Sequence, residues 1–129
     1  MIFVDSDYFM SFVGADHPRR AEVRAFFVVM AERDVRLVTS AEVLRELLHT
    51  YLERDDPHLL EAALGLVDGT VDEVWPVERS DVELARNLSI RYPGLEARDL
   101  VHLACCIRRQ PRALMTFDRG LAAAWRSRS

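Results

Sequence analysis

Apolar residues recur along the chain with two different spacings, and each spacing predicts one kind of secondary structure. Unbroken apolar runs that are too short for an ordinary helix indicate strands buried on both faces. Longer segments with apolar residues every three or four positions indicate helices with one buried side. The short runs predict strands over 2–5, 35–39, 73–75 and 113–116. The longer segments predict a short helical turn over 7–13, helices over 16–33, 39–53, 56–69, 80–91 and 96–109, and a last short helix from 118.

The alternation of these strands and helices predicts an α/β fold. Parallel strands need long crossover connections, and helices of this length provide them. Strands that are apolar on both faces also need helices on both sides. We therefore expect a parallel sheet covered on both faces. No repeat or linker divides the 129 residues, so we expect one domain.

Polar residues at fixed spacings mark where several of the helices begin. Thr39 and Glu42 have the spacing of a capping box, and Ser80 and Glu83 repeat it. Asp16, two residues before a proline, indicates another helix start. The helix that begins near Glu42 is predicted to have one apolar stripe, formed by Val43, Leu44, Leu47, Leu48, Tyr51 and Leu52.

Composition narrows the class of protein. Half of the residues are apolar, 29% are charged and the formal net charge is −4, which argues against a broad nucleic-acid-binding surface. All 17 basic residues are arginine, and this excludes chemistry that depends on lysine, such as that of a phosphate-loop NTPase. The longest apolar run, 25–31, is far below the ~20 residues of a membrane span, and no secretory signal is recognisable. Cys105 and Cys106 are neighbours and cannot cross-link the fold, so we expect a cytoplasmic protein without membrane contact.

Two carboxylates directly follow predicted strands. Asp5 comes at the end of the first strand, and Asp118 follows the last. In open α/β sheets, ligands bind beyond the carboxyl ends of the strands. An ionised carboxylate at a buried strand end needs a hydrogen bond, a basic partner or a metal. Each of these residues also suits the cap of the next helix, so both interpretations stay open.

Two further carboxylates lie on helices that can flank the same edge of the sheet. Glu46 lies off the apolar stripe, where it either faces solvent or reaches over a strand end. Asp99 lies near a helix start, at the boundary of the buried side. His102 and Cys106 follow Asp99 at i+3 and i+7, but a lone thiol beside a hard carboxylate is a weak zinc signal. Carboxylates that converge at one edge repel one another, and a hard divalent cation such as Mg²⁺ or Mn²⁺ relieves that repulsion.

Four short motifs occur in the order and at the separations of a known family. They are Ile2-Phe3-Val4-Asp5-Ser6-Asp7, Thr39-Ser40 with Glu46, Ala97-Arg98-Asp99-Leu100-Val101-His102-Leu103-Ala104 and Met115-Thr116-Phe117-Asp118-Arg119. Through these motifs the chain resembles a PIN-domain ribonuclease of the VapC toxin type over nearly its whole length. The resemblance implies a PIN-like three-layer α/β/α sandwich, a single domain over residues 1–129 with a central parallel sheet of about four to five strands.

The resemblance also implies roles for particular residues. The implied metal-binding and catalytic carboxylates are Asp5, Glu46, Asp99 and Asp118, with Glu46 acting directly or through water. Ser6, Asp7 and Thr116 would support them, and Asp7 stands where relatives often have asparagine. Gly120 stands where many relatives have a further acid, which bears on whether one or two ions bind.

The activity implied by the resemblance is hydrolysis of RNA phosphodiester bonds by a Mg²⁺- or Mn²⁺-dependent endoribonuclease. Such proteins commonly act as the toxin of a type II toxin–antitoxin pair, form homodimers and are inhibited by a cognate antitoxin. Arg98 and Arg119 lie near the expected site, where they either contact the RNA backbone or face solvent.

Two other functions stay open. Asp5 and Asp7 after a buried strand also have the nucleophile-and-acid spacing of a haloacid-dehalogenase-type phosphatase. That class expects Thr or Val where this chain has Phe9, and it usually needs a lysine, which is absent. A non-catalytic RNA- or protein-binding PIN module would keep the fold without the reaction, but all four carboxylates are present.

Overall fold

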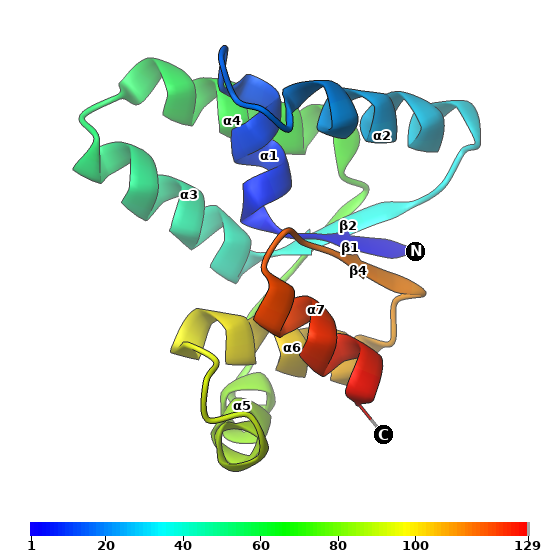
Figure 1. Cartoon of the computed structure of the whole chain (residues 1–129), viewed down its shortest axis with the longest axis vertical. Helices are drawn as coiled ribbons and strands as arrows, with labels where there is room; N and C mark the ends of the chain where they lie inside the picture. Colours follow the sequence, from blue (N-terminus) through cyan, green and yellow to red (C-terminus); the bar gives the residue numbers. More distant parts are fainter. Residues whose placement is uncertain (129) are drawn as a thin grey trace.

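The chain folds into three layers, with a sheet between two groups of helices, in the computed structural model of Figure 1, which describes residues 1–128. Its strands are β1 (Ile2–Val4), β2 (Leu37–Ser40), β3 (Glu73–Trp75) and β4 (Ala113–Met115). Its helices are α1 (Ser6–Val13), α2 (Arg20–Glu32), α3 (Ala41–Glu53), α4 (Pro57–Thr70), α5 (Arg79–Arg91), α6 (Ala97–Arg109) and α7 (Arg119–Ser127). Helices α1 to α4 lie on one side of the sheet and α5 to α7 on the other (Figure 1). The predicted α/β/α sandwich is therefore confirmed.

The sheet consists of four parallel strands in the order β3-β2-β1-β4, which is within the predicted number. The central strand β1 aligns Phe3 with Val38 of β2 on one side and with Leu114 of β4 on the other. Phe3 is fully buried, as a strand apolar on both faces requires. Asp5 N donates to Met115 O at 2.9 Å, so β1 and β4 end side by side. This alignment brings the residues that follow both strands to one edge of the sheet.

The N-cap of helix α3 lies one residue later in the chain than predicted. Ser40, not Thr39, caps the helix, and its hydroxyl accepts a hydrogen bond from Val43 N at 3.3 Å. The Thr39 hydroxyl instead donates to Val4 O at 2.8 Å and links β2 to β1. The neighbouring strand thus competes for a hydroxyl that the local spacing assigns to the helix.

Two other helix starts also differ from the prediction. The N-cap of α5 is Glu78, two residues before the predicted Ser80, and its backbone N–H donates to Asp81 Oδ2 at 2.8 Å. Helix α2 begins at Arg20, and no side chain caps it, so the predicted cap at Asp16 is wrong. A local capping box does fix the start of α5, but it is formed by Glu78 and Asp81 and not by the predicted pair.

Two of the six residues of the predicted apolar stripe on α3 face away from the core, since Leu44 is partly buried against it. Val43, Leu47 and Tyr51 are buried at positions i, i+4 and i+8. Leu48 and Leu52 are 45% and 64% exposed. The stripe was predicted too wide because six apolar positions cover more of the circumference than the helix buries.

A buried ion-pair cluster joins α5 to α6. The Asp81 side chain is fully buried, and its Oδ1 accepts hydrogen bonds from Nη1 of Arg108 and of Arg109, each at 2.8 Å. Arg109 also donates to Glu78 Oε1 at 2.9 Å and lies over the Trp75 ring at 5.3 Å. Burial alone would raise the pKa of Asp81, but the two guanidinium groups and the Glu78 N–H hold it far below its usual range. We call Glu78, Asp81, Arg108 and Arg109 the α5–α6 clamp.

Two features of the composition can be located in the fold. Cys105 and Cys106 are free thiols buried on α6, inside the core. Within residues 1–128, no helix is both long and apolar enough to cross a membrane.

Candidate functional site

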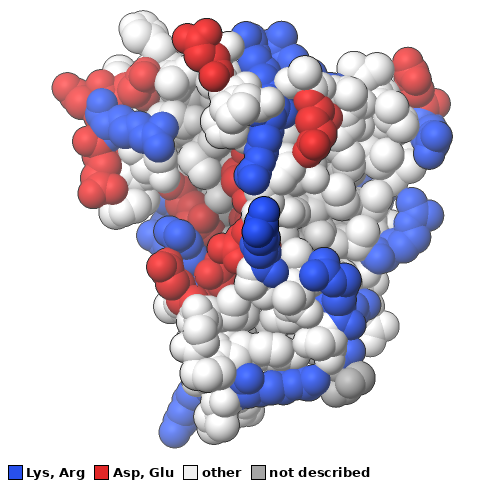
Figure 2. Space-filling model, viewed as in Figure 1, with Lys and Arg blue, Asp and Glu red and all other residues white. Residues whose placement is uncertain are grey.

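The carboxylates singled out in the sequence meet in one cavity at the carboxyl ends of β1 and β4. This cavity, here called the acidic pocket, has a volume of about 260 Å³. Its lining includes Asp5, Glu46, Asp99 and Asp118. They come from the end of β1, the middle of α3, the first turn of α6 and the start of α7. Figure 2 shows acidic side chains recessed on this face with arginine side chains beside them. Residues that lie far apart in the sequence are therefore brought together as predicted.

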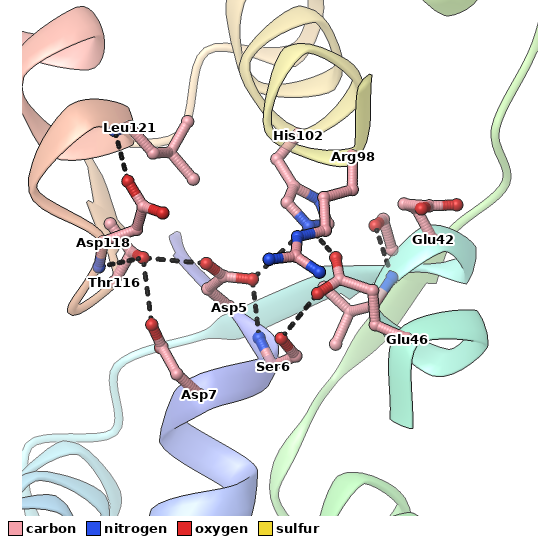
Figure 3. Close-up of polar contacts among 12 residues, drawn as sticks. Asp5, Ser6, Asp7, Glu42, Glu46, Arg98, His102, Thr116, Asp118 and Leu121 are labelled. Atoms are coloured by element: carbon pink, nitrogen blue, oxygen red, sulfur yellow. Dashed lines mark hydrogen bonds and ion pairs between the residues drawn. The ribbon is translucent and has the colours of Figure 1, made fainter. Parts of the chain in front are cut away.

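Asp5 both caps α1 and faces the acidic pocket. Its side chain is 4% exposed, and Oδ1 accepts a hydrogen bond from Ser6 N at 2.7 Å. Oδ2 accepts a hydrogen bond from Thr116 Oγ1 at 2.7 Å (Figure 3). The cap and the functional interpretation of Asp5 are therefore compatible, because the capping contact does not turn the carboxylate away from the pocket.

Glu46 points from α3 into the acidic pocket (Figure 3). It is 9% exposed, its Oε2 accepts a hydrogen bond from Ser6 Oγ at 2.9 Å, and its Oε1 contacts His102 Nε2. Burial alone would raise the pKa of Glu46, but the bonds from His102 and Ser6 lower it below its ordinary value. Glu46 is therefore held as an anion, and the interpretation as a solvated residue is wrong.

His102 belongs to the site although the sequence analysis did not place it there. Its ring is fully buried, and Nε2 contacts Glu46 Oε1 and lies 3.4 Å from Asp5 Oδ1. Burial favours the neutral ring, but these two carboxylates raise the pKa of His102 overall. One ligand atom from each of the three residues lies within 4.8 Å of the others, so the cluster could hold a metal ion. The i+3 spacing from Asp99 does mark His102, but Cys106, the other residue of that pattern, lies in the core.

Asp99 and Asp118 have few hydrogen-bond partners within residues 1–128. Asp99 is 7% exposed, and burial together with the charge of Asp118 raises its pKa to about 6. Asp118 Oδ1 accepts a hydrogen bond from Leu121 N at 2.9 Å and caps α7 (Figure 3). Its second oxygen remains available to the acidic pocket. Asp118, like Asp5, is both a cap and a residue of the pocket.

Thr116 and Asp7 support the carboxylates from the β4 side. The Thr116 hydroxyl donates to Asp5 Oδ2, lies 3.2 Å from Asp7 Oδ2, and accepts a hydrogen bond from Asp118 N at 3.0 Å. Phe117 N donates to Asp7 Oδ2 at 2.9 Å. Burial and the nearby charge of Asp5 nevertheless raise the pKa of Asp7 to about 7. Asp7 is therefore a second acid in the pocket whose negative charge is poorly compensated.

Two arginines line the acidic pocket. Arg98 is one of them, as predicted, and its Nη2 lies 3.3 Å from Glu96 Oε2. Arg54, at the end of α3, is the other and was not predicted. Arg119 is exposed and is not part of the lining. That Arg98 contacts an RNA backbone stays a prediction.

The acidic pocket fits a hard divalent cation. Its four carboxylates supply the oxygen ligands that Mg²⁺ and Mn²⁺ prefer. The raised pKa values of Asp7 and Asp99 indicate negative charge that the neighbouring cations of the chain do not balance. Oδ1 of Asp7 is also buried without a hydrogen-bond partner within residues 1–128.

Gly120 lies directly against Asp118. A Cβ at this position would lie 3.3 Å from Asp118 Oδ1 and 3.2 Å from Leu95 Cδ2. A further acid here would therefore have to displace the end of the Leu95 side chain.

Comparisons by sequence and by structure lead to the same group of proteins. The family model described as PIN domain matches residues 2–125. Ribonuclease VapC23 of Mycobacterium tuberculosis is 51% identical over 127 residues, which cover 98% of this chain and 100% of that protein. Ribonuclease VapC13 of the same species is 42% identical over 120 residues, which cover 93% and 92%.

A solved structure has the same fold. The crystal structure of M. tuberculosis VapC20, described as a sarcin–ricin loop cleaving toxin, matches with a TM-score of 0.80 over 96% of this chain and 95% of that one. The sequences are 23% identical, so this likeness concerns the fold alone.

Proposed function

This chain belongs to the PIN-domain family, and on that premise we propose that it is a metal-dependent endoribonuclease that hydrolyses RNA phosphodiester bonds. It is the toxin component of a type II toxin–antitoxin pair. The names of the relatives at 51% and 42% identity, both ribonucleases of the VapC group, support this function. We also propose that residues 1–129 act as one domain.

The observation that carries the proposal is the convergence of four carboxylates from four elements at one end of the sheet. Burial and the charge of Asp118 raise the pKa of Asp99, so the ionised pocket is electrostatically costly for the chain alone. An anionic RNA phosphate would not enter such a pocket unless a cation balanced the charge. A bound divalent cation therefore accounts for both the geometry and the electrostatics.

Each residue of the acidic pocket has a role in this proposal. Asp5, Asp99 and Asp118 would hold Mg²⁺ or Mn²⁺, and Glu46 would complete the site directly or through water. When bound, such an ion activates water and stabilises negative charge on the phosphate. Three supporting residues fix the carboxylates by hydrogen bonds or charge: Ser6 and His102 hold Glu46, and Thr116 holds Asp5. Asp7 would tune the charge of the pocket from its edge.

The partners of the chain follow from the same family assignment. We propose RNA as the substrate, a cognate antitoxin as the inhibitor, and a homodimer as the assembly. A cytoplasmic location is part of the same proposal.

The phosphatase alternative is weakened by the residues that surround Asp5. Four carboxylates meet there, and the chain has no lysine for the basic role that this class of phosphatase usually needs. A non-catalytic PIN module would not need four converging carboxylates. Both alternatives are kept as outcomes of the test below.

The test is cleavage of a panel of structured RNAs by the purified chain with Mg²⁺, with Mn²⁺ or with EDTA. We expect cleavage with either metal and none with EDTA. Asp99→Asn should be inactive, and the control Asp68→Asn, which changes an exposed acid on α4, should be active. Turnover of p-nitrophenyl phosphate would support the phosphatase. Metal-dependent RNA binding without cleavage would support the binding module and contradict the proposal.

A further inference from the structure

We propose that a second cavity beside the acidic pocket binds the single-stranded RNA that flanks the scissile phosphate, and that Arg19 and Arg54 contact its backbone. This inference rests on the proposed function and extends it to a substrate subsite. The cavity, here called the flanking cleft, has a volume of about 210 Å³. It lies between the segment that connects α1 to α2, the end of α3 and the start of α4, and its lining includes Arg19, Tyr51 and Arg54.

The flanking cleft continues the acidic pocket. Asp7, Met10 and Arg54 line both cavities. An RNA strand with one phosphate at the carboxylates therefore has a neighbouring hollow for the next part of the strand. At about 210 Å³, the flanking cleft has room for a single base or a phosphate group.

The charge of the flanking cleft differs from that of the acidic pocket. Arg19 and Arg54 are both exposed, and within residues 1–128 neither forms an ion pair with a carboxylate. Arg98, in the acidic pocket, lies instead beside Glu96. Guanidinium groups without a carboxylate partner keep their donors for a phosphate, which they bind with two parallel hydrogen bonds. The arginines beside the recessed acids in Figure 2 fit an anionic strand that approaches over this face.

Aromatic rings hold both arginines of the flanking cleft, and Arg54 lies at its border with the acidic pocket. Arg19 lies over the Phe117 ring, with the guanidinium carbon 4.1 Å from the centroid, and Phe117 stacks on Tyr8 at 4.5 Å. Arg54 lies over the Tyr51 ring at 5.9 Å. Arginine planes fixed in this way also provide a surface on which unpaired bases stack. The flanking cleft therefore fits unpaired RNA better than a helical stem.

The test compares two variants with two matched controls. Arg19→Ala and Arg54→Ala remove the proposed contacts. Arg24→Ala is the control for Arg19. Arg19 is the N-cap residue of α2 and Arg24 lies within the same helix, and Arg24 also lies over a phenylalanine ring, that of Phe12, at 4.9 Å. Arg33→Ala is the control for Arg54, because each is the C-cap residue of its helix. Arg54 lines the acidic pocket, but none of the four arginines is a carboxylate ligand or a hydrogen-bond partner of one of the four carboxylates. All four proteins should therefore fold, and Mn²⁺ titration should show that they bind the ion as the wild type does.

The first measurement is steady-state cleavage of a single-stranded oligoribonucleotide that contains a site cut in the panel. We expect Arg19→Ala and Arg54→Ala to raise KM about tenfold with kcat nearly unchanged, as the loss of one charged hydrogen bond predicts. Both controls should match the wild type. Arg54→Lys, which keeps the charge, should recover part of the loss.

The second measurement is binding of a labelled single-stranded oligoribonucleotide of mixed sequence to Asp99→Asn protein over a range of salt concentrations. Each alanine variant should reduce the slope of log affinity against log salt by about one, as the loss of one phosphate contact predicts. This measurement tests the flanking cleft even if no RNA is cleaved. Absence of cleavage would count against the proposed function and not against the cleft. Slopes and affinities equal to those of the controls would overturn the inference and make the cleft a surface for a protein partner.

Discussion

Helix α6 contacts buried carboxylates at both of its ends, and their pKa values shift in opposite directions. At the C-terminal end, Arg108 and Arg109 of the α5–α6 clamp lower the pKa of Asp81. Near the N-terminal end, burial and the charge of Asp118 raise the pKa of Asp99 to about 6. Both aspartates are buried to a similar degree, at 0% and 7% exposure. The difference therefore lies in the partners that the chain supplies and not in burial.

The comparison separates a buried acid whose charge the chain balances from one whose charge it does not. The clamp pairs its carboxylate with cations from the same chain, so the charges are balanced once the chain has folded. The acidic pocket gathers several carboxylates and leaves part of their charge unbalanced, and in the proposed function a cation from solution would balance it. This difference in partners is what supports the proposed roles, a structural one for Asp81 and a catalytic one for Asp99.

The largest effect is expected from Asp99→Asn. Removing this ligand should lower RNA cleavage on the order of 1,000-fold, since a bound ion contributes several kcal/mol to stabilising charge in the transition state. The same variant should be as stable as the wild type or more stable, because a charge with a raised pKa is removed. Cleavage rates measure the activity of this variant, and urea unfolding of the same preparation measures its stability. If Asp99→Asn lost activity only because it unfolded, the charge of Asp99 would be needed for folding, as that of Asp81 is, and the difference between the two regions would be wrong.

The reverse result is expected from Asp81→Asn. The substitution leaves two guanidinium groups facing a neutral amide in place of their buried counter-charge, and it should cost about 3 kcal/mol of unfolding free energy. Cleavage per folded molecule should not change, because the clamp lies at the other end of α6. Urea unfolding and cleavage well below the melting temperature measure the two quantities. A loss of activity larger than twofold in fully folded Asp81→Asn protein would show that the two regions are coupled.

The dependence of stability on pH should have opposite signs in the two regions. The pKa of Asp7 is about 7 in the folded chain against an ordinary value of 3.8, so the folded state binds more protons and stability falls as the pH rises from about 4 to about 7. The pKa of Asp81 is lowered on folding, so its contribution is present above about pH 4 and is lost as the pH falls further.

Urea unfolding in EDTA between pH 3 and pH 8 measures both dependences. In Asp7→Asn, the fall in unfolding free energy between about pH 4 and pH 7 should be smaller than in the wild type by about 1–2 kcal/mol. In Asp81→Asn, the fall in unfolding free energy below about pH 4 should be smaller than in the wild type. If Asp7→Asn left the neutral side unchanged, the pocket would not hold uncompensated charge near that residue.

Sequence motifs predicted the acidic pocket well because its residues follow from topology. Asp5 and Asp118 come directly after neighbouring parallel strands, so the register of β1 and β4 brings them to one edge of the sheet. Glu46 was left open between solvent and site, because helical periodicity gives a direction but not the presence of Ser6 opposite.

What the sequence could not predict depends on contacts between distant segments. His102 joins the site through carboxylates 56 and 97 positions earlier in the chain, and only the tertiary fold brings them together. Thr39 was taken for a helix cap, but its hydroxyl contacts the neighbouring strand. Arg19 and Arg54 lie in or at the end of connecting segments, where no periodicity indicates the direction of a side chain.

The most direct test of the central claim is the change in unfolding free energy when Mn²⁺ is added. A ligand that binds only the folded state should stabilise the wild type by about 2.7 kcal/mol at 100 times its dissociation constant. Asp81→Asn should gain the same amount from a lower starting value, and Asp99→Asn should gain much less. An equal gain in Asp99→Asn, or none in the wild type, would contradict the claim that the acidic pocket is completed by a metal ion.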